Sequence, residues 1–174
     1  MIVVLWAVAI LIVLFGFVVF RHGAPYVPSR KRDLDVAFDD LCRISEEDVV
    51  VDIGAGDGVV MRAAARRGAT AIGYELNPVL VLVAKWLNRN YSKTKMILAD
   101  FYHTDLPADT TVLYIFAEAR DIGRMAKMIQ KHVDKNQRPV KVISLAFKIP
   151  NKSPVGHVEP YFLYQFAPLH NGVA

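Results

Sequence analysis

The chain has 174 residues, 53% of them hydrophobic, and a formal net charge of +4. That charge is too small to indicate a nucleic-acid-binding protein by itself, and the one cysteine excludes an intrachain disulfide and a cysteine-rich metal site. We expect no metal ligand cluster and no nucleic-acid partner. Outside the apolar N-terminus about 150 residues remain, which suits one compact domain with a buried core.

The N-terminal residues 2–20 contain no charged and no polar side chain. At about 1.5 Å per residue, a helix of this length reaches about 28 Å, close to the roughly 30 Å hydrocarbon core of a bilayer. A cleaved signal peptide and a buried core helix are the alternatives. No basic residue precedes the apolar run, and Phe20-Arg21-His22-Gly23 is a poor cleavage site. We therefore predict an uncleaved transmembrane anchor over residues 1–21.

The charges that follow this segment predict its orientation. Four basic residues come before the first acid of the chain: Arg21, Arg30, Lys31 and Arg32. Because basic flanks stay in the cytoplasm, we expect a cytoplasmic domain and an external Met1. Residues 22–32 form a basic linker with Pro and Gly, and residues 33–174 form the domain.

From residue 49 onward, β-branched runs alternate with helical patterns. Strands are predicted over residues 49–53, 70–74, 95–98, 111–116, 140–147 and 161–166. Helices are predicted around residues 34–41, 58–67 and 121–135, and after Asn77-Pro78, which is a good N-cap and first-turn pair. Short helical crossovers predict a mostly parallel, doubly wound, Rossmann-like sheet. The tail after Ile149 is rich in proline and is predicted to be a loop with one edge strand.

The segment Asp52-Ile53-Gly54-Ala55-Gly56-Asp57-Gly58 covers the last two residues of the first strand and the loop after it. Ligands of such sheets sit at the carboxyl ends of the strands, and Gly54 and Gly56 let the backbone turn and approach one. A dinucleotide motif has its third glycine at the position of Val59. The spacing therefore disfavours NAD or FAD and suits a ligand without a pyrophosphate. A glycine turn without a ligand is the alternative.

Two further acids end the second and third predicted strands. Glu75 lies 23 residues after Asp52, where a carboxylate can accept both hydroxyls of a ribose; a structural carboxylate at a helix entry is the alternative. Asp100 can accept the amino group of an adenine, and Phe101 offers a ring or backbone contact; a surface turn is the alternative. Three acids at the tips of three successive strands favour a nucleoside-containing ligand.

With these motifs the chain resembles the class I S-adenosylmethionine-dependent methyltransferases. Two segments, Pro25-Tyr26-Val27-Pro28 and Gly73-Tyr74-Glu75-Leu76-Asn77-Pro78, narrow the resemblance. They are similar to small membrane-anchored protein-lysine methyltransferases, whose mitochondrial members modify the ATP synthase c subunit and the adenine nucleotide translocase. The similarity spans roughly residues 24–150 and includes a preceding apolar segment.

This resemblance implies a class I methyltransferase fold, S-adenosylmethionine as the cofactor, and methyl transfer to a lysine of a membrane protein. It implies a cofactor site lined by Asp52, Gly54, Gly56, Glu75, Asn77 and Asp100. It also implies that Tyr26 lies near the methyl group or the target lysine. Two alternatives are kept: methylation of a lipid or small molecule, and a non-catalytic nucleoside-binding module tethered to the membrane.

The chain departs from this family after the fourth predicted strand. It has Ile115-Phe116-Ala117-Glu118-Ala119 where the family tends to have a small apolar residue and proline. Glu118 can hold a lysine ammonium or help it lose its proton; an exposed first-turn carboxylate is the alternative. Tyr102 and His103 can border the same pocket, or lie on the surface.

A basic stripe runs along the predicted helix 121–135. It consists of Arg124, Lys127, Lys131 and Lys135. A solvated helix face is one interpretation of this stripe, and contact with anionic lipid headgroups is the other.

Overall fold

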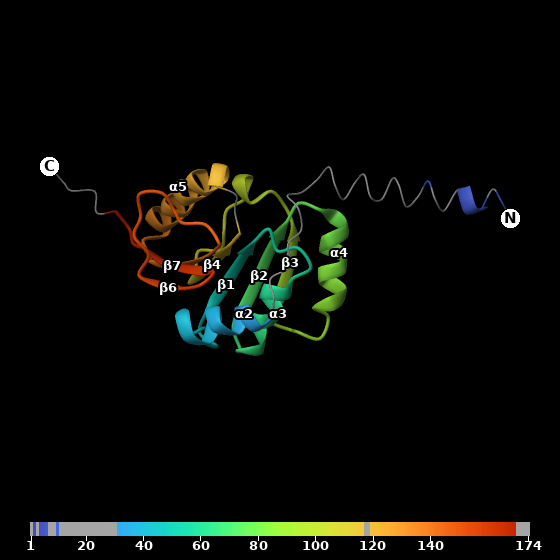
Figure 1. The fold of residues 1–174 in the computed structure, drawn as a ribbon, viewed down its shortest axis with the longest axis horizontal. Coiled ribbons are helices and arrows are strands. Elements are labelled where there is room, and N and C mark those ends of the chain that lie inside the picture. The colour runs from blue at the N-terminus through green and yellow to red at the C-terminus, as the bar shows by residue number, and fades with distance from the viewer. Residues whose placement is uncertain (1, 3, 7–9, 11–30, 117–118, 170–174) are drawn as a thin grey trace.

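The computed structural model describes residues 2, 4–6, 10, 31–116 and 119–169 (Figure 1). A seven-stranded sheet with the order β3-β2-β1-β4-β5-β7-β6 forms its centre. The strands are β1 Val49–Ile53, β2 Thr70–Glu75, β3 Thr94–Leu98, β4 Val112–Ile115, β5 Val140–Leu145, β6 Gly156–Val158 and β7 Tyr161–Phe166. The helices are α2 Lys31–Asp35, the π-helix η1 Val36–Leu41, α3 Val59–Arg66, α4 Pro78–Leu87, the 3-10 helix η2 Phe101–His103 and α5 Ala119–Asn136.

Strands β1 to β5 run parallel, and β7 lies antiparallel between β5 and β6. Asp52 of β1 stands opposite Gly73 of β2, and Glu75 of β2 stands opposite Leu98 of β3. The carboxyl ends of these three strands therefore meet at one edge of the sheet. The prediction of a mostly parallel, Rossmann-like sheet is confirmed.

Helices cover both faces of the sheet, and each face has its own hydrophobic core. One core joins α2, η1, α3 and α4 to the sheet, and the other joins α5 to it. Successive strand residues point to opposite faces, so Val50 belongs to the first core and Val51 to the second. The packing of the first core leaves no space for a side chain at Gly73. A Cβ at this position would meet the sulfur of Met61 and would come within 2.7 Å of the Ala55 Cβ.

The start of α4 follows from a local sequence signal. The Asn77 side-chain oxygen accepts hydrogen bonds from the backbone N–H groups of Val79 at 2.9 Å and Leu80 at 3.4 Å, and Pro78 occupies the first turn. This satisfies donors that a helix start leaves without partners. The predicted Asn-Pro helix start is confirmed.

Two predictions about the last part of the chain were wrong. The strand Tyr161–Phe166 was predicted at the sheet edge, but it lies between β5 and β6, with buried apolar side chains on both faces. The edge strand is the three-residue β6, which is too short to show a period in sequence. The fifth strand also ends at Leu145 instead of residue 147, because Ala146 adopts a left-handed φ of +65°.

The predicted transmembrane anchor, residues 2–20, lies largely outside the described residues, as does most of the predicted linker 22–32. Five positions of the apolar run are described, and they are helical and exposed: Ile2, Val4, Leu5, Trp6 and Ile10. Within the described ranges, no helix combines the length and the hydropathy that a membrane crossing requires.

Candidate functional site

The glycine loop turns over the end of β2 and leaves one side open. The backbone N–H groups of Gly54 and Ala55 both donate to the carbonyl of Tyr74, at 2.9 and 3.0 Å. Gly54 and Gly56 have left-handed φ angles of +78° and +54°, which glycine adopts without strain. A Cβ added at Gly54 would meet no heavy atom of the described structure within 4 Å, apart from its chain neighbours. The loop thus leaves room for a ligand beside its backbone.

Glu75 is held against this loop by two backbone donors. Its Oε2 accepts a hydrogen bond from the Gly56 N–H at 3.0 Å, and its Oε1 accepts one from the Asn77 N–H at 2.8 Å. Each carboxylate oxygen keeps a further lone pair. The carboxylate is therefore fixed in place while it remains able to accept two hydroxyl groups.

Asp52 is a buried carboxyl group with an unsatisfied oxygen. The residue is 3% exposed, and its Oδ2 has no hydrogen-bond partner among the described residues. Burial, followed by the negative charges of Glu75 and Asp57, raises the pKa of Asp52 from 3.8 to about 8. Since buried polar groups are normally hydrogen-bonded, this oxygen is suited to a ligand that brings a donor or a positive charge.

The other acid of the loop, Asp57, already has a cationic partner. Its Oδ2 forms an ion pair with Arg62 Nη2 at 3.0 Å, and its Oδ1 accepts a hydrogen bond from the Val59 N–H at 3.1 Å. Arg62 also donates to the Asn88 side-chain oxygen at 3.1 Å. Asp57 therefore organises the start of α3. Arg62 was not predicted from the sequence, although a basic residue five positions after Asp57 is the signal for this pair.

Asp100 lies at the end of β3, as predicted, and caps η2. Its Oδ1 accepts a hydrogen bond from the Tyr102 N–H at 2.9 Å, and its Oδ2 lies 2.9 Å from Nδ1 of His103. The Phe101 ring packs on the Tyr102 ring, with 4.0 Å between the centroids. Asp100 therefore caps η2, as the surface-turn alternative predicted. The contacts of Asp100 and Phe101 with an adenine stay predictions. A cofactor contact of the capping residue Asn77 also stays a prediction.

Two residues, Tyr26 and Glu118, were predicted to lie near the lysine that accepts the methyl group. Both are outside the described residues. Close to Glu118 in sequence, Phe116 directly follows β4, and its ring lies 6.2 Å from that of Phe147, in the loop after β5. This aromatic pair was not predicted. Aromatic residues near two neighbouring strand ends are the signal that identifies it.

One residue of the predicted basic stripe contacts the same edge of the sheet. The guanidinium of Arg124, on α5, lies 3.9 Å from the centroid of the Tyr102 ring. This cation–π contact joins α5 to η2, directly after the strand that ends near Asp100. Arg124 therefore packs against η2 and is not simply solvated, and Tyr102 lies beside the predicted cofactor site.

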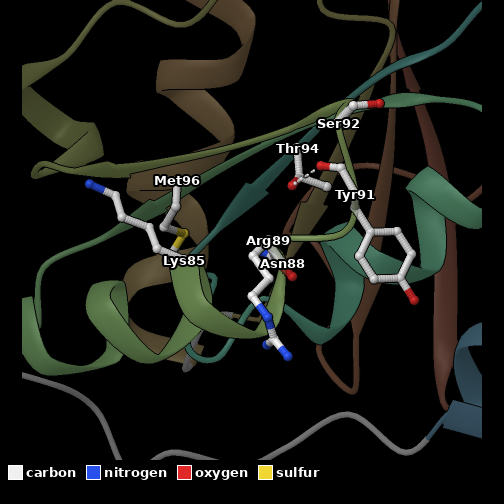
Figure 2. Close-up of a pocket in the computed structure, with 7 residues that line it drawn as sticks. All are labelled: Lys85, Asn88, Arg89, Tyr91, Ser92, Thr94 and Met96. Atoms are coloured by element: carbon white, nitrogen blue, oxygen red, sulfur yellow. Dashed lines mark hydrogen bonds between the residues drawn. The ribbon is translucent and has the colours of Figure 1, made fainter.

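A separate pocket of about 290 Å³ opens between the end of α4 and the start of β3 (Figure 2). Its lining includes Lys85, Asn88, Arg89, Thr94 and Met96. Because Thr94 begins β3 and Asp100 follows the end of that strand, this pocket lies toward the other end of the sheet. It shares no residue with the predicted cofactor site.

Solved structures of proteins in complex with S-adenosylmethionine or S-adenosyl-L-homocysteine have the same fold. An RNA methyltransferase from Salinibacter ruber in complex with S-adenosyl-L-homocysteine has a TM-score of 0.70 and 23% identity, over 82% of this chain and 94% of that one. A mutant of MtNAS in complex with S-adenosylmethionine has a TM-score of 0.62 and 16% identity, over 79% and 60% of the two chains. At these identities the likeness concerns the fold.

Sequence relatives point to a narrower group. The human lysine N-methyltransferase of the ATP synthase c subunit is 30% identical over 134 residues, which are 75% of this chain and 54% of that protein. The Xenopus laevis protein of the same name is 32% identical over 133 residues, covering 75% and 56%. A protein-lysine N-methyltransferase of Saccharolobus islandicus is 25% identical over 138 residues, covering 75% and 81%. The chain thus spans little more than half the length of the two vertebrate relatives.

A family model covers the centre of the chain. The model described as the ANTKMT methyltransferase domain matches residues 52–156. This range begins at the buried acid of β1 and ends at the first residue of β6, so it contains the glycine loop, Glu75 and Asp100. The chain belongs to the family of the ANTKMT methyltransferase domain.

Proposed function

We propose that this chain is an S-adenosylmethionine-dependent protein-lysine N-methyltransferase. The observation that carries the proposal is the buried Asp52 carboxyl, whose Oδ2 lacks a partner among the described residues. It belongs to the strand that leads into the open side of the glycine loop, and it suits a cationic ligand. S-adenosylmethionine carries an ammonium group, and membership of the methyltransferase family supports this choice.

The described residues fit the remaining parts of such a ligand. Glu75, fixed by two backbone N–H groups, has lone pairs left for the two ribose hydroxyls. Gly54 and Gly56 let the ligand approach the backbone, and Asp100 is our proposed acceptor for the adenine amino group. When bound, S-adenosylmethionine supplies an electrophilic methyl group.

The residues that we assign to the binding of the acceptor lysine are predicted from the sequence. A lysine ammonium must lose a proton before its nitrogen can attack a methyl carbon. We propose that Glu118 holds the ammonium or accepts that proton, and that Tyr26 helps to orient the side chain. Positioning and the exclusion of water then supply most of the rate.

A lysine of a membrane protein is our proposed acceptor. The names of the human and Xenopus laevis relatives specify a lysine of the ATP synthase c subunit, and the Saccharolobus islandicus relative is named as a protein-lysine enzyme. The apolar composition of residues 2–20 and the basic residues after it support a single-pass anchor, with the domain on the cytoplasmic side. Tethering raises the effective concentration of a membrane substrate without new contacts.

The test uses the full chain in mild detergent, S-adenosylmethionine with a tritiated methyl group, and a membrane fraction. We expect label in protein, at lysine by mass spectrometry, and loss of that label in Glu75→Ala but not in Glu47→Ala, a matched exposed acid. Label in the organic extract would replace the lysine acceptor with a lipid or small molecule. Ligand-induced stabilisation without any transfer would instead favour the non-catalytic binding module.

A further inference from the structure

The outer side of α4 exposes an unusual set of side chains for a helix that packs on a sheet. Leu82, Lys85 and Trp86 occupy the i, i+3 and i+4 positions of α4, so they share one side of the helix, and Arg89 lies in the turn that follows the helix. Leu82 is 67% exposed and Trp86 is 63% exposed. Val81 and Ala84 face the core, so the helix is apolar on its outer side as well as its inner side.

Two basic residues, Lys85 and Arg89, accompany these apolar side chains. Between Glu75 and Asp100 the chain has four basic residues and no acidic one: Lys85, Arg89, Lys93 and Lys95. The Arg89 guanidinium lies 4.6 Å from the Trp86 ring centroid, and its Nη1 donates to the Trp86 carbonyl at 2.8 Å. Within the described part of the chain, Lys85 has no ion-pair partner. Hydrophobic and positive groups therefore occur together here.

Further apolar groups extend this surface toward the predicted cofactor site. Leu76 lies two residues before α4 and is 51% exposed, and Leu98 ends β3 and is 54% exposed. Since β3 is the outermost strand, no neighbouring strand covers Leu98 from that side. Figure 1 shows α4 beside β3 at this end of the sheet, far from β6 and β7.

We propose that this α4 surface, defined by Leu76, Leu82, Lys85, Trp86, Arg89 and Leu98, contacts a bilayer that contains anionic lipids. Tryptophan and leucine enter the interfacial region, while lysine and arginine are attracted to anionic headgroups. Lys85 and Arg89 also line the pocket of Figure 2, where both could reach a headgroup phosphate. The positive charges of Lys85 and Arg89 favour contact with an anionic bilayer over contact with a neutral one.

The basic stripe of α5 is less suited to this role. α5 contains the acids Asp121 and Asp134 among its basic residues. Lys135 forms an ion pair with Asp105 at 2.8 Å, and Arg124 packs on an aromatic ring. On the α4 surface, in contrast, Leu76 and Leu98 lie near the strand ends that carry Glu75 and Asp100, whereas Lys85 and Arg89 lie toward the other end of the sheet.

The test measures the environment of Trp86 in the full chain. Trp6→Phe leaves Trp86 as the only tryptophan. This chain is reconstituted in nanodiscs of phosphatidylcholine, with or without phosphatidylglycerol, in which part of the phosphatidylcholine is brominated. We expect Trp86 emission to shift to the blue and to be quenched by the brominated chains in anionic discs. We expect weaker quenching in neutral discs and in high salt.

The charge requirement is tested in the same background. Lys85→Glu with Arg89→Glu should reduce the quenching at least about twofold, because each basic residue near an anionic surface contributes to binding. The exposed pair Lys127→Glu with Lys131→Glu, on α5, is the matched control and should leave it unchanged. Water-like, unquenched Trp86 emission in anionic discs overturns the proposal, as does an equal effect of the two pairs. A blue shift that depends on protein concentration and not on lipid overturns it in favour of a second copy of the chain.

Discussion

Replacement of Asp52 by asparagine tests the electrostatics of the cofactor site, because it keeps the shape of the side chain and removes its charge. Burial, together with the negative charges of Glu75 and Asp57, raises the pKa of Asp52 from 3.8 to about 8. The folded state therefore binds a proton between pH 4 and pH 8 that the unfolded state has released. The stability that this group contributes is fully present below its unfolded pKa and is lost as the pH rises through its folded pKa.

The size of the effect follows from this shift. A pKa change of this size corresponds to a loss of unfolding free energy on the order of 4 kcal/mol between pH 4 and pH 7. Asparagine cannot ionise, so the unfolding free energy of the variant does not include this pH-dependent loss. We expect Asp52→Asn to match the wild type near pH 4 and to be more stable by about 4 kcal/mol at pH 7 in the absence of ligand.

The same substitution should have the opposite effect on ligand binding. S-adenosylmethionine at a hundred times its dissociation constant stabilises a protein by about 2.7 kcal/mol, and we expect most of this gain to disappear in the variant. In the wild type, the affinity should rise as the pH increases toward 8, because pairing with an ammonium requires the ionised form of Asp52. This rise should be absent in Asp52→Asn.

The assay is urea unfolding of the full chain in mild detergent between pH 4 and pH 9, with and without ligand. Asp109→Asn, at an exposed aspartate, is the matched control and should follow the wild type at every pH. Parallel pH profiles for the wild type and Asp52→Asn would refute the raised pKa. Full ligand stabilisation in Asp52→Asn would refute the pairing of Asp52 with the ligand.

Three further substitutions test single contacts. Glu75→Gln should weaken S-adenosylmethionine binding about tenfold or more in calorimetric titration, because a hydrogen bond to a charged group contributes about 1.5–3 kcal/mol. Glu47→Gln is the control. Unchanged affinity would show that Glu75 does not contact the ligand. Asn77→Ala should lower the free energy of unfolding by about 1 kcal/mol in urea, because α4 loses its cap, and a neutral result would contradict this capping role. Gly73→Ala should lower the free energy of unfolding by about 1–3 kcal/mol in the same assay, because the added Cβ would come within 2.7 Å of the Ala55 Cβ. An unchanged urea midpoint would show that the core adjusts to the added methyl group.

Local signals in the sequence were enough to predict most of the fold. The run Val49–Ile53 is rich in β-branched residues and forms β1 at the predicted bounds, and the Asn77-Pro78 pair starts α4. The order of the last strands was not predictable in this way, because it depends on which distant strands pair. Gly156–Val158 is too short to carry a period of its own, and it forms a strand only through its pairing with β7.

For the candidate site, sequence reasoning predicted positions better than electrostatic states. Parallel strands bring their carboxyl ends to one edge, so the placement of Asp52, Glu75 and Asp100 could be inferred from the strand pattern. Which acid has a partner depends on tertiary contacts: Asp57 pairs with Arg62, whereas Asp52 is buried without one among the described residues. The cap role of Asn77 likewise shows that a family motif residue can act through helix geometry.

The position of β7 inside the sheet has a consequence for how the chain is made. A ribosome synthesises residues 161–166 after the other six strands of the sheet, yet this strand is the one that pairs with β5. Until it leaves the exit tunnel, β5 has no partner on that side, and unpaired strand edges favour association with other chains. The nascent domain therefore depends on late completion of its sheet, and a premature stop before residue 161 leaves that edge open permanently.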